Sequence, residues 1–180
     1  MTLTIQRLSC SLALALGAFC NHAAAVTCLN GLDTAVPVST PTSAFDIGTD
    51  GTLVDPRTGL MWMHCLLGQT LVAGRCTGTA TTATWAAALT AARALSFAGH
   101  ADWRLPNPKE AASILEDRCA NPALNADLFP IGDFNTWTAT PVAGMLTGIY
   151  DNVWVVGSDG VMAPVSKNQT ITFILVRKAP

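Results

Sequence analysis

The chain has 180 residues, of which 50% are hydrophobic and 12% are charged. Ten Lys and Arg stand against twelve Asp and Glu, and this lack of a basic excess excludes a dedicated nucleic-acid binder. The low charged fraction also disfavours intrinsic disorder, so we expect one compact domain after any processed segment.

The first 25 residues have the pattern of a secretory signal peptide. Arg7 provides the positive charge, residues 8–20 form a short apolar run, and Ala23-Ala24-Ala25 offers a cleavage site. The apolar run is too short to cross a membrane, and no other stretch of the sequence approaches that length. We therefore expect residues 1–25 to be removed and the protein to be exported, with no membrane span, to the periplasm, the cell surface or the medium.

Four cysteines remain after that segment: Cys28, Cys65, Cys76 and Cys119. In an exported chain they predict two disulfides, for which three pairings exist. Cys65 and Cys76 bracket a short loop whose glycines let the chain double back, so we pair these two and, by elimination, Cys28 with Cys119. A zinc site is the alternative, but the chain lacks the closely spaced cysteine pairs of such sites.

The mature chain begins with an extended lead-in, residues 26–44, which is rich in Thr, Ser, Pro and Ala. Residues 45–180 form the single domain. In it, residues 52–54 and 60–63 are predicted strands, because apolar and branched side chains flank the strong turn sequence Asp-Pro-Arg-Thr-Gly.

Two helices follow in the prediction. Residues 84–98 carry apolar side chains at three- and four-residue spacing, and Gly99 is expected to end this helix. The second helix is expected to begin after the N-cap Asn107, where Glu110 completes a capping box, and to run to about Arg118.

Short strands predominate after residue 120. We expect them at residues 135–140, 153–156, 161–165 and 171–176, where branched and aromatic side chains gather. The Gly-Ser-Asp-Gly run between the middle two predicts a hairpin turn. A hairpin, two helices and then antiparallel strands together favour the α+β class.

Several runs of the sequence together resemble the Lcl C-terminal domain family. They are GTLVDPRTGLMWMHC, TWAAAL, FAGHADWRLPNPKEAASIL, LFP, TWTAT, VWVVGSDG and FILVR, and they cover roughly residues 45–177. The most specific element of the resemblance is a pentad formed by Asp102, Trp103, Arg104, Leu105 and Pro106.

The resemblance implies a fold akin to C-type lectin-like and formylglycine-generating-enzyme domains, with two helices packed on a twisted antiparallel sheet, and a role in extracellular recognition. In the collagen-like adhesin that gives the family its name, the domain is linked to trimerisation and to binding of sulfated glycosaminoglycans. This chain has no collagen-like Gly-x-y tract, and of its basic residues only Arg177 and Lys178 are adjacent. We therefore extend neither property to it.

The pentad between the two predicted helices has two interpretations. Asp102 and Arg104 would flank a substrate in a catalytic interpretation. In the structural one, a buried Arg–carboxylate pair pins the junction and Trp103 lies in the core. We favour the structural interpretation, in which removal of one partner alone costs several kcal/mol.

No cofactor or metal is expected. Asp46, Asp50 and Asp55 are spaced faintly like the ligands of a calcium loop. Arg57 occupies the twelfth position, where an EF-hand needs Glu, and this excludes an EF-hand. An irregular surface calcium site is the remaining alternative.

An enzyme is not expected either. Residues 26–180 contain two histidines, His64 and His100, with no nucleophile-elbow motif and no H-E-x-x-H pattern. A copper-dependent oxidase of the formylglycine-generating type needs a reactive cysteine pair, and all four cysteines are assigned to bridges. We place His100 at the end of the first helix beside Gly99, where a cationic ring complements the helix dipole.

The candidate ligand-binding residues are Tyr150, Asp151 and Asn152, which follow a Gly-rich loop, because loops of this sort carry binding in lectin-like folds. Most of the five tryptophans are expected in the core. The leading hypothesis is an exported, disulfide-stabilised, non-enzymatic binding domain, adhesin-like, for a surface glycan or an envelope protein. The alternatives are an accessory or assembly component of a pilus or other envelope structure, and a degenerate enzyme of the formylglycine-generating-type fold.

Overall fold

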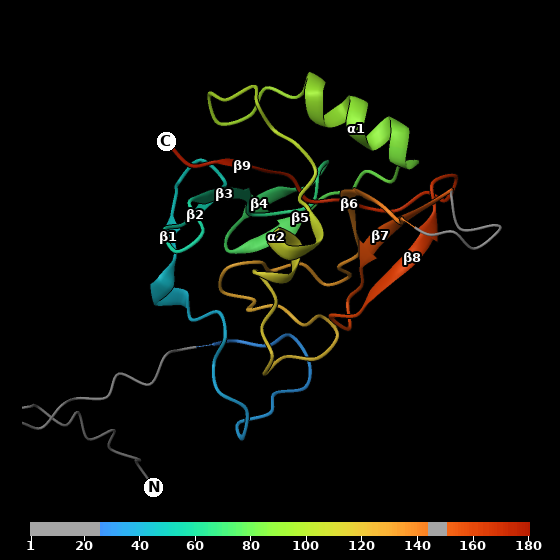
Figure 1. Cartoon of the computed structure of the whole chain (residues 1–180). Coiled ribbons are helices and arrows are strands. Elements are labelled where there is room, and N and C mark those ends of the chain that lie inside the picture. The colour runs from blue at the N-terminus through green and yellow to red at the C-terminus, as the bar shows by residue number, and fades with distance from the viewer. Residues whose placement is uncertain (1–25, 144–150) are drawn as a thin grey trace, which may run out of the picture.

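Three antiparallel sheets and two α-helices form the part of the chain that the computed structural model describes, residues 26–143 and 151–180 (Figure 1). The sheets have the strand orders β1-β2-β3-β9, β4-β5 and β6-β7-β8. Helices together with antiparallel strands are typical of the predicted α+β class, but the strands form three small sheets rather than one. The predicted signal segment, residues 1–25, lies outside the described residues.

The elements have short spans. The first sheet consists of β1 Asp46–Ile47, β2 Thr52–Asp55, β3 Leu60–Met63 and β9 Val176–Lys178. The second consists of β4 Thr70–Val72 and β5 Arg75–Thr77, and the third of β6 Thr136–Pro141, β7 Asn152–Val156 and β8 Met162–Ser166. The helices are α1 Trp85–Ala94 and α2 Pro108–Ala112, and a 3₁₀ turn covers Thr42–Ala44.

The β2–β3 hairpin confirms the first predicted pair of strands. Residues 52–55 pair in register with residues 60–63. The Asp55 carbonyl accepts hydrogen bonds from the N–H groups of Thr58 (3.2 Å) and Gly59 (2.9 Å). Gly59 takes a φ of +66°, which glycine adopts without steric cost. The turn chemistry of the sequence therefore fixes the register of the β2–β3 pair at the centre of the first sheet.

The third sheet confirms three of the later predicted strands, those at 135–140, 153–156 and 161–165, and the hairpin between the last two. β7 and β8 pair over residues 152–156 and 162–166, and the Gly160 N–H donates to the Gly157 carbonyl (2.9 Å) in the turn between them. The predicted strand 171–176 is wrong, because pairing within a sheet begins only at Val176. Residues 173–175 are fully buried, and the carbonyls of Leu175 and Phe173 accept from the N–H groups of Met63 (3.1 Å) and Leu67 (3.0 Å) outside any continuous strand pairing.

Helix α1 is shorter than the predicted 84–98. It ends at Ala94, and Leu95 already has an extended backbone. Phe97 and His100 then exchange two backbone hydrogen bonds of 2.9 and 3.0 Å around a tight turn that contains Gly99. The placement of His100 at the helix end is therefore wrong, and Gly99 serves this turn instead of the helix terminus.

Helix α2 begins as predicted and ends early. The Asn107 side chain accepts from the Glu110 N–H (2.9 Å), and the Glu110 carboxylate accepts from the Asn107 N–H (2.7 Å). This is the expected capping box. The helix stops at Ala112 rather than near Arg118. Beyond it the chain turns to form contacts with the lead-in, in which Glu116 accepts hydrogen bonds from residues 39–40.

Both predicted disulfides are present, Cys28–Cys119 and Cys65–Cys76. The first joins the lead-in to the segment after α2, and the second joins the end of β3 to β5. Three of the five tryptophans, Trp62, Trp103 and Trp137, are almost fully buried in the core, as expected. Within the described residues, neither helix has the length and apolar character needed to span a membrane.

Candidate functional site

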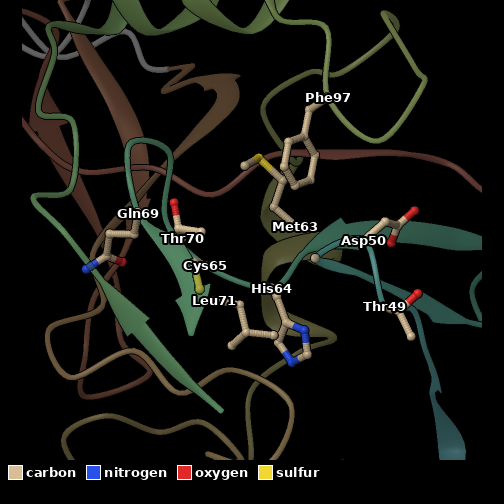
Figure 2. A pocket seen from close by; sticks show the side chains of 10 residues that line it. Thr49, Asp50, Met63, His64, Cys65, Gln69, Thr70, Leu71 and Phe97 are labelled. Carbon is tan, nitrogen blue, oxygen red and sulfur yellow. The ribbon is translucent and has the colours of Figure 1, made fainter. Parts of the chain in front are cut away.

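A pocket of about 250 Å³ lies where the first and second sheets meet. Three short segments and one aromatic ring line it. They are residues 49–51, residues 63–65, residues 69–71 and the ring of Phe97. Figure 2 shows Phe97 and Met63 on the opposite side of the pocket from His64 and Leu71. The volume lies just below the roughly 300–1,000 Å³ of pockets that enclose a drug-sized ligand, so it suits one small unit such as a single sugar ring.

His64 is the most buried polar side chain of this pocket, with 4% of its surface exposed. It directly follows β3, and its backbone N–H donates to the Gly51 carbonyl (2.9 Å), which holds it against the β1–β2 loop. Burial lowers the pKa of the His64 imidazole, against an opposing hydrogen bond to the Asp127 backbone. The ring is therefore neutral at pH 7.

The His64 Nδ1 atom is buried and has no hydrogen-bond partner among the described residues. A buried nitrogen without a partner costs about 1–3 kcal/mol.

The second wall of the pocket is the β4–β5 hairpin and the residues before it. Gln69 donates through Nε2 to the Gly78 carbonyl at 3.5 Å, which orients the amide. Its Oε1 is buried and makes no hydrogen bond to any described residue. The Cys65–Cys76 disulfide ties this hairpin to β3, and Cys65 itself lines the pocket. The bridge therefore holds one wall of the pocket against the other.

The rim carries the carboxylate of Asp50. Its Oδ1 accepts from the Thr52 hydroxyl (2.6 Å) and the Thr52 N–H (3.2 Å). The Thr52 hydroxyl is the main cause of a pKa for Asp50 below its usual range, so the group is anionic at neutral pH. Gly51 has a φ of +86°, and a Cβ there would lie 3.1 Å from the Phe97 ring. The loop can therefore approach the aromatic wall only with glycine at this position.

Phe97 forms the apolar wall. Its ring packs edge-on against Trp103 with 5.8 Å between centroids, and the Trp103 indole N–H donates to the Phe97 carbonyl (3.1 Å). Phe97 is only partly buried, so one face of the ring remains available at the pocket. The pentad thus supports the pocket from behind through Trp103.

The structural interpretation of the pentad is correct for Trp103 and wrong for its ion pair. Asp102 pairs with Arg177 (2.7 Å), and Arg104 pairs with Glu110 through two bonds of 2.7 Å. Neither pair is buried, since Asp102 is 60% and Arg104 46% exposed. Leu105 and Pro106 are buried beside Trp103. The pentad is therefore a packed junction with two surface ion pairs on its flanks.

The predicted ligand-binding residues are not part of the pocket. Tyr150 lies outside the described residues. Asp151 accepts from the Asn168 side-chain amide (3.0 Å), and Asn152 pairs with Ser166 in the third sheet. Asp151 and Asn152 therefore do not line the pocket that contains His64 and Phe97.

The three carboxylates that suggested a calcium loop have separate roles. Asp46 is exposed on β1, Asp50 bonds Thr52, and the fully buried Asp55 binds the Arg57 guanidinium (3.0 Å). Over residues 26–143 and 151–180, no group of three or more His, Cys, Asp or Glu side chains gathers as a metal site would require.

Sequence reasoning missed the pocket because four separate segments build it. One signal was visible, since a histidine follows an apolar strand directly and precedes a bridged cysteine. That pattern places a polar side chain at a buried strand end, but it does not reveal which loops surround it.

The comparisons with known proteins agree with the resemblance found in the sequence. The model of the Lcl C-terminal domain family matches residues 51–177. This range contains every residue of the pocket except two, Thr49 and Asp50. No curated protein matches the chain.

Proposed function

Because the chain belongs to the Lcl C-terminal domain family, we propose that it is an exported, non-enzymatic recognition domain, adhesin-like, that binds a surface glycan. The family and the two disulfides fit a disulfide-stabilised extracellular domain. Export by the segment 1–25 and a C-type lectin-like or formylglycine-generating-enzyme-like arrangement are parts of the same proposal.

The observation that carries the proposal is the pocket at the end of β3. It combines a partly exposed aromatic ring, Phe97, with the exposed polar side chains of Thr49, Asp50 and Thr70. A sugar ring offers the matching surfaces, an apolar face for stacking and hydroxyl groups for hydrogen bonds. The volume admits one such unit, as expected for recognition of a chain end.

The proposal of a binding rather than a catalytic role follows from the groups at the pocket. Cys65 and Cys76 are joined in a disulfide and supply no thiolate nucleophile. The His64 ring is oriented by a backbone group, and no serine or threonine hydroxyl hydrogen-bonds its Nδ1 among the described residues. A triad would need both a nucleophile and an orienting carboxylate there. We propose no resident cofactor.

A second candidate is an accessory or assembly role in a pilus or other envelope structure. It is favoured by β8, the edge strand of the third sheet, whose start is exposed and apolar at Val161 (57%) and Met162 (43%). An edge of this kind can accept a strand from another protein. In this case the partner would be an envelope protein and no glycan would bind.

Glycan-array binding by the oxidised protein, measured with and without EDTA, separates the two candidates. Binding to a defined set of glycans that persists in EDTA supports the recognition role and the absence of a calcium requirement. Loss of that binding in EDTA would support the irregular calcium site instead. Failure to bind any glycan, together with capture of a single pilus protein from the host envelope, would refute the glycan proposal and support assembly.

A further inference from the structure

We propose that Pro164 closes the free edge of the third sheet to strand addition, so that copies of this protein do not pair with one another edge to edge. The proposal concerns a different part of the molecule from the pocket, and it does not depend on the glycan-binding role.

The two edges of the third sheet differ in what covers them. Beside β6, the Ala139 N–H donates to the Pro106 carbonyl (2.7 Å), and the Thr136 hydroxyl accepts from the Ile174 N–H (3.2 Å). Residues 162–166 of β8 have no segment of this kind along their outer side among the described residues. In Figure 1, β8 lies at the outside of this sheet. Such an edge offers its backbone groups to another chain.

The composition of β8 makes this edge prone to self-association. Residues 161–166 contain no charged side chain, and the first two, Val161 and Met162, are 57% and 43% exposed. A short apolar strand of low charge is typical of segments that pair with their own copies, unless a proline interrupts it. Proteins often protect an edge with Lys or with Pro, and this strand has only the proline.

The pairing of β8 with β7 shows which of its backbone groups face outward. At the two ends of the pair, the Gly157 N–H donates to the Val161 carbonyl (2.9 Å) and the Lys167 N–H donates to the Asp151 carbonyl (2.8 Å). Along an antiparallel strand, residues that bond to the partner alternate with residues that face away from it. In this register, residues 161, 163, 165 and 167 bond to β7, and residues 162, 164 and 166 face outward.

Pro164 therefore stands in the middle of the three outward-facing positions. Proline has no N–H to donate, and its ring carbon Cδ occupies the direction in which that N–H would point. Paired strands lie about 4.7–4.9 Å apart, which leaves no room for the ring between them. A proline at residue 163 or 165 would instead remove a bond to β7. The position of Pro164 thus blocks an added strand without weakening the sheet, and an assembly partner would need a strand that bulges or ends opposite it.

Sedimentation equilibrium of the oxidised protein at neutral pH, over a range of concentrations, tests the proposal with two variants. Pro164→Thr restores the outward N–H. Ala163→Thr introduces the same side chain at the neighbouring exposed position, whose N–H faces β7, and is the matched control. We expect Pro164→Thr to associate with itself about ten-fold more tightly than wild type or Ala163→Thr, because the partner strand no longer leaves a group unpaired. Equal association of the two variants, or no gain in a folded Pro164→Thr protein, would overturn the proposal.

Amide hydrogen exchange locates the contact and also tests the wild type alone. In the wild type, the Met162 and Ser166 amides should exchange rapidly at every protein concentration, whereas the Ala163 and Val165 amides should be protected by β7. In Pro164→Thr, protection at residues 162, 164 and 166 should rise with concentration. Protection of Met162 and Ser166 that rises with concentration in the wild type would show that the edge already pairs, and would overturn the proposal while leaving the glycan-binding role intact.

Discussion

Two carboxylates, those of Asp55 and Glu116, have no exposed surface, and each is compensated in a different way. Asp55 accepts three hydrogen bonds from Arg57, one from its backbone N–H and two from its guanidinium. Glu116 has no cationic partner and is bound by N–H and hydroxyl donors of residues 39–40 and by the Arg118 N–H. A buried charge persists only when its lone pairs are used in this way.

Glu116 is therefore expected to make the stability of the protein depend on pH. Burial raises its pKa, but the hydrogen bonds, led by that of the Thr40 backbone, outweigh burial and hold the pKa below its usual range. A folded-state pKa below the unfolded value contributes stability at neutral pH that is lost as the pH falls through the folded value. Glu116→Gln should cost about 2–3 kcal/mol at pH 7, because its amide brings N–H groups against N–H donors.

Urea unfolding of the two proteins at pH 7 and near pH 3 measures this effect. The stability difference between wild type and Glu116→Gln should shrink at the lower pH. Asp117→Asn, which alters the adjacent exposed carboxylate, is the control and should stay within about 0.5 kcal/mol of wild type. A difference that is unchanged between the two pH values would contradict the assigned role of Glu116.

The pentad should respond to mutation through its tryptophan rather than its ion pairs. Arg104→Met removes a two-bond pair with Glu110, but the Arg104 side chain is 46% exposed, so a cost of about 0.5–1 kcal/mol is expected. Trp103→Ala should cost about 3–5 kcal/mol, because the side chain is almost fully buried and supports Phe97. Thermal unfolding of both variants checks the order, and a larger loss for Arg104→Met would show that the pair is the main support.

Residue roles that depend on nearby sequence were predictable, and those that depend on distant sequence were not. The capping box of Asn107 and Glu110 spans three residues and was found. The partner of Asp102 is Arg177, 75 residues away, and nothing local indicates it. The sequence predicts a buried ion pair for Arg104, but the capping residue of α2, Glu110, binds its guanidinium at the surface.

At the scale of the elements, tertiary contacts explain each wrong boundary. The apolar spacing of residues 84–98 continues past Ala94, but Phe97 leaves the helix to pack on Trp103. The second helix ends early because residues beyond it bind the lead-in. Intrinsic periodicity is a weak preference that such contacts override.

The β4–β5 hairpin is the element on which ligand binding should depend most. Its residues 70–77 are largely exposed, and the Cys65–Cys76 bridge ties it to β3. Replacement of both cysteines by Ser should lower stability by about 3 kcal/mol and abolish glycan binding, since residues 69–71 line the pocket.

Hydrogen exchange distinguishes this local effect from global unfolding. Amides of residues 70–77 should lose protection in the double-Ser variant at neutral pH, whereas those of β2 and β3 should keep it. Retained glycan binding in that variant would show that the hairpin forms its wall without the bridge.

For the whole molecule, the lead-in is an integral part of the fold although it precedes the family match at residues 51–177. Thr40 is buried and donates to Glu116, and the Asn125 side chain donates to the Thr40 carbonyl (2.9 Å). The Cys28–Cys119 bridge attaches the start of the lead-in to the segment after α2. In Figure 1 the lead-in, drawn in blue, passes along one side of the body.

Loss of the Cys28–Cys119 bridge should cost more than loss of Cys65–Cys76. Its cysteines are 91 residues apart, against 11 for the other bridge, and the chain-entropy model gives about 4–5 kcal/mol for a loop of that length. Urea unfolding of the two double-Ser variants under the same conditions tests this order. A chain that begins at residue 45 should be destabilised further still, because Glu116 loses its donors from residues 39–40 and the Asn125 amide loses the Thr40 carbonyl. A smaller loss for the Cys28 and Cys119 variant would contradict the tethering role of the lead-in.

The site was the least predictable level of organisation. The pocket needs the β1–β2 loop, the end of β3, the β4–β5 hairpin and Phe97 in one place. Sequence patterns identified the first hairpin, the Cys65–Cys76 pair and the burial of Trp103, which support the pocket. The meeting of these supports is a three-dimensional property that spacing along the chain does not encode.

The place of β9 in the first sheet has a consequence for biosynthesis. Residues 60–62 of β3 pair with residues 176–178, so this sheet stays open on a nascent chain until its last strand has left the ribosome. The partner of Cys28 likewise emerges only after 90 further residues. The domain can therefore reach its final form only after translation of residue 178. This timing is compatible with the proposed export, because a polypeptide must stay unfolded while it is translocated.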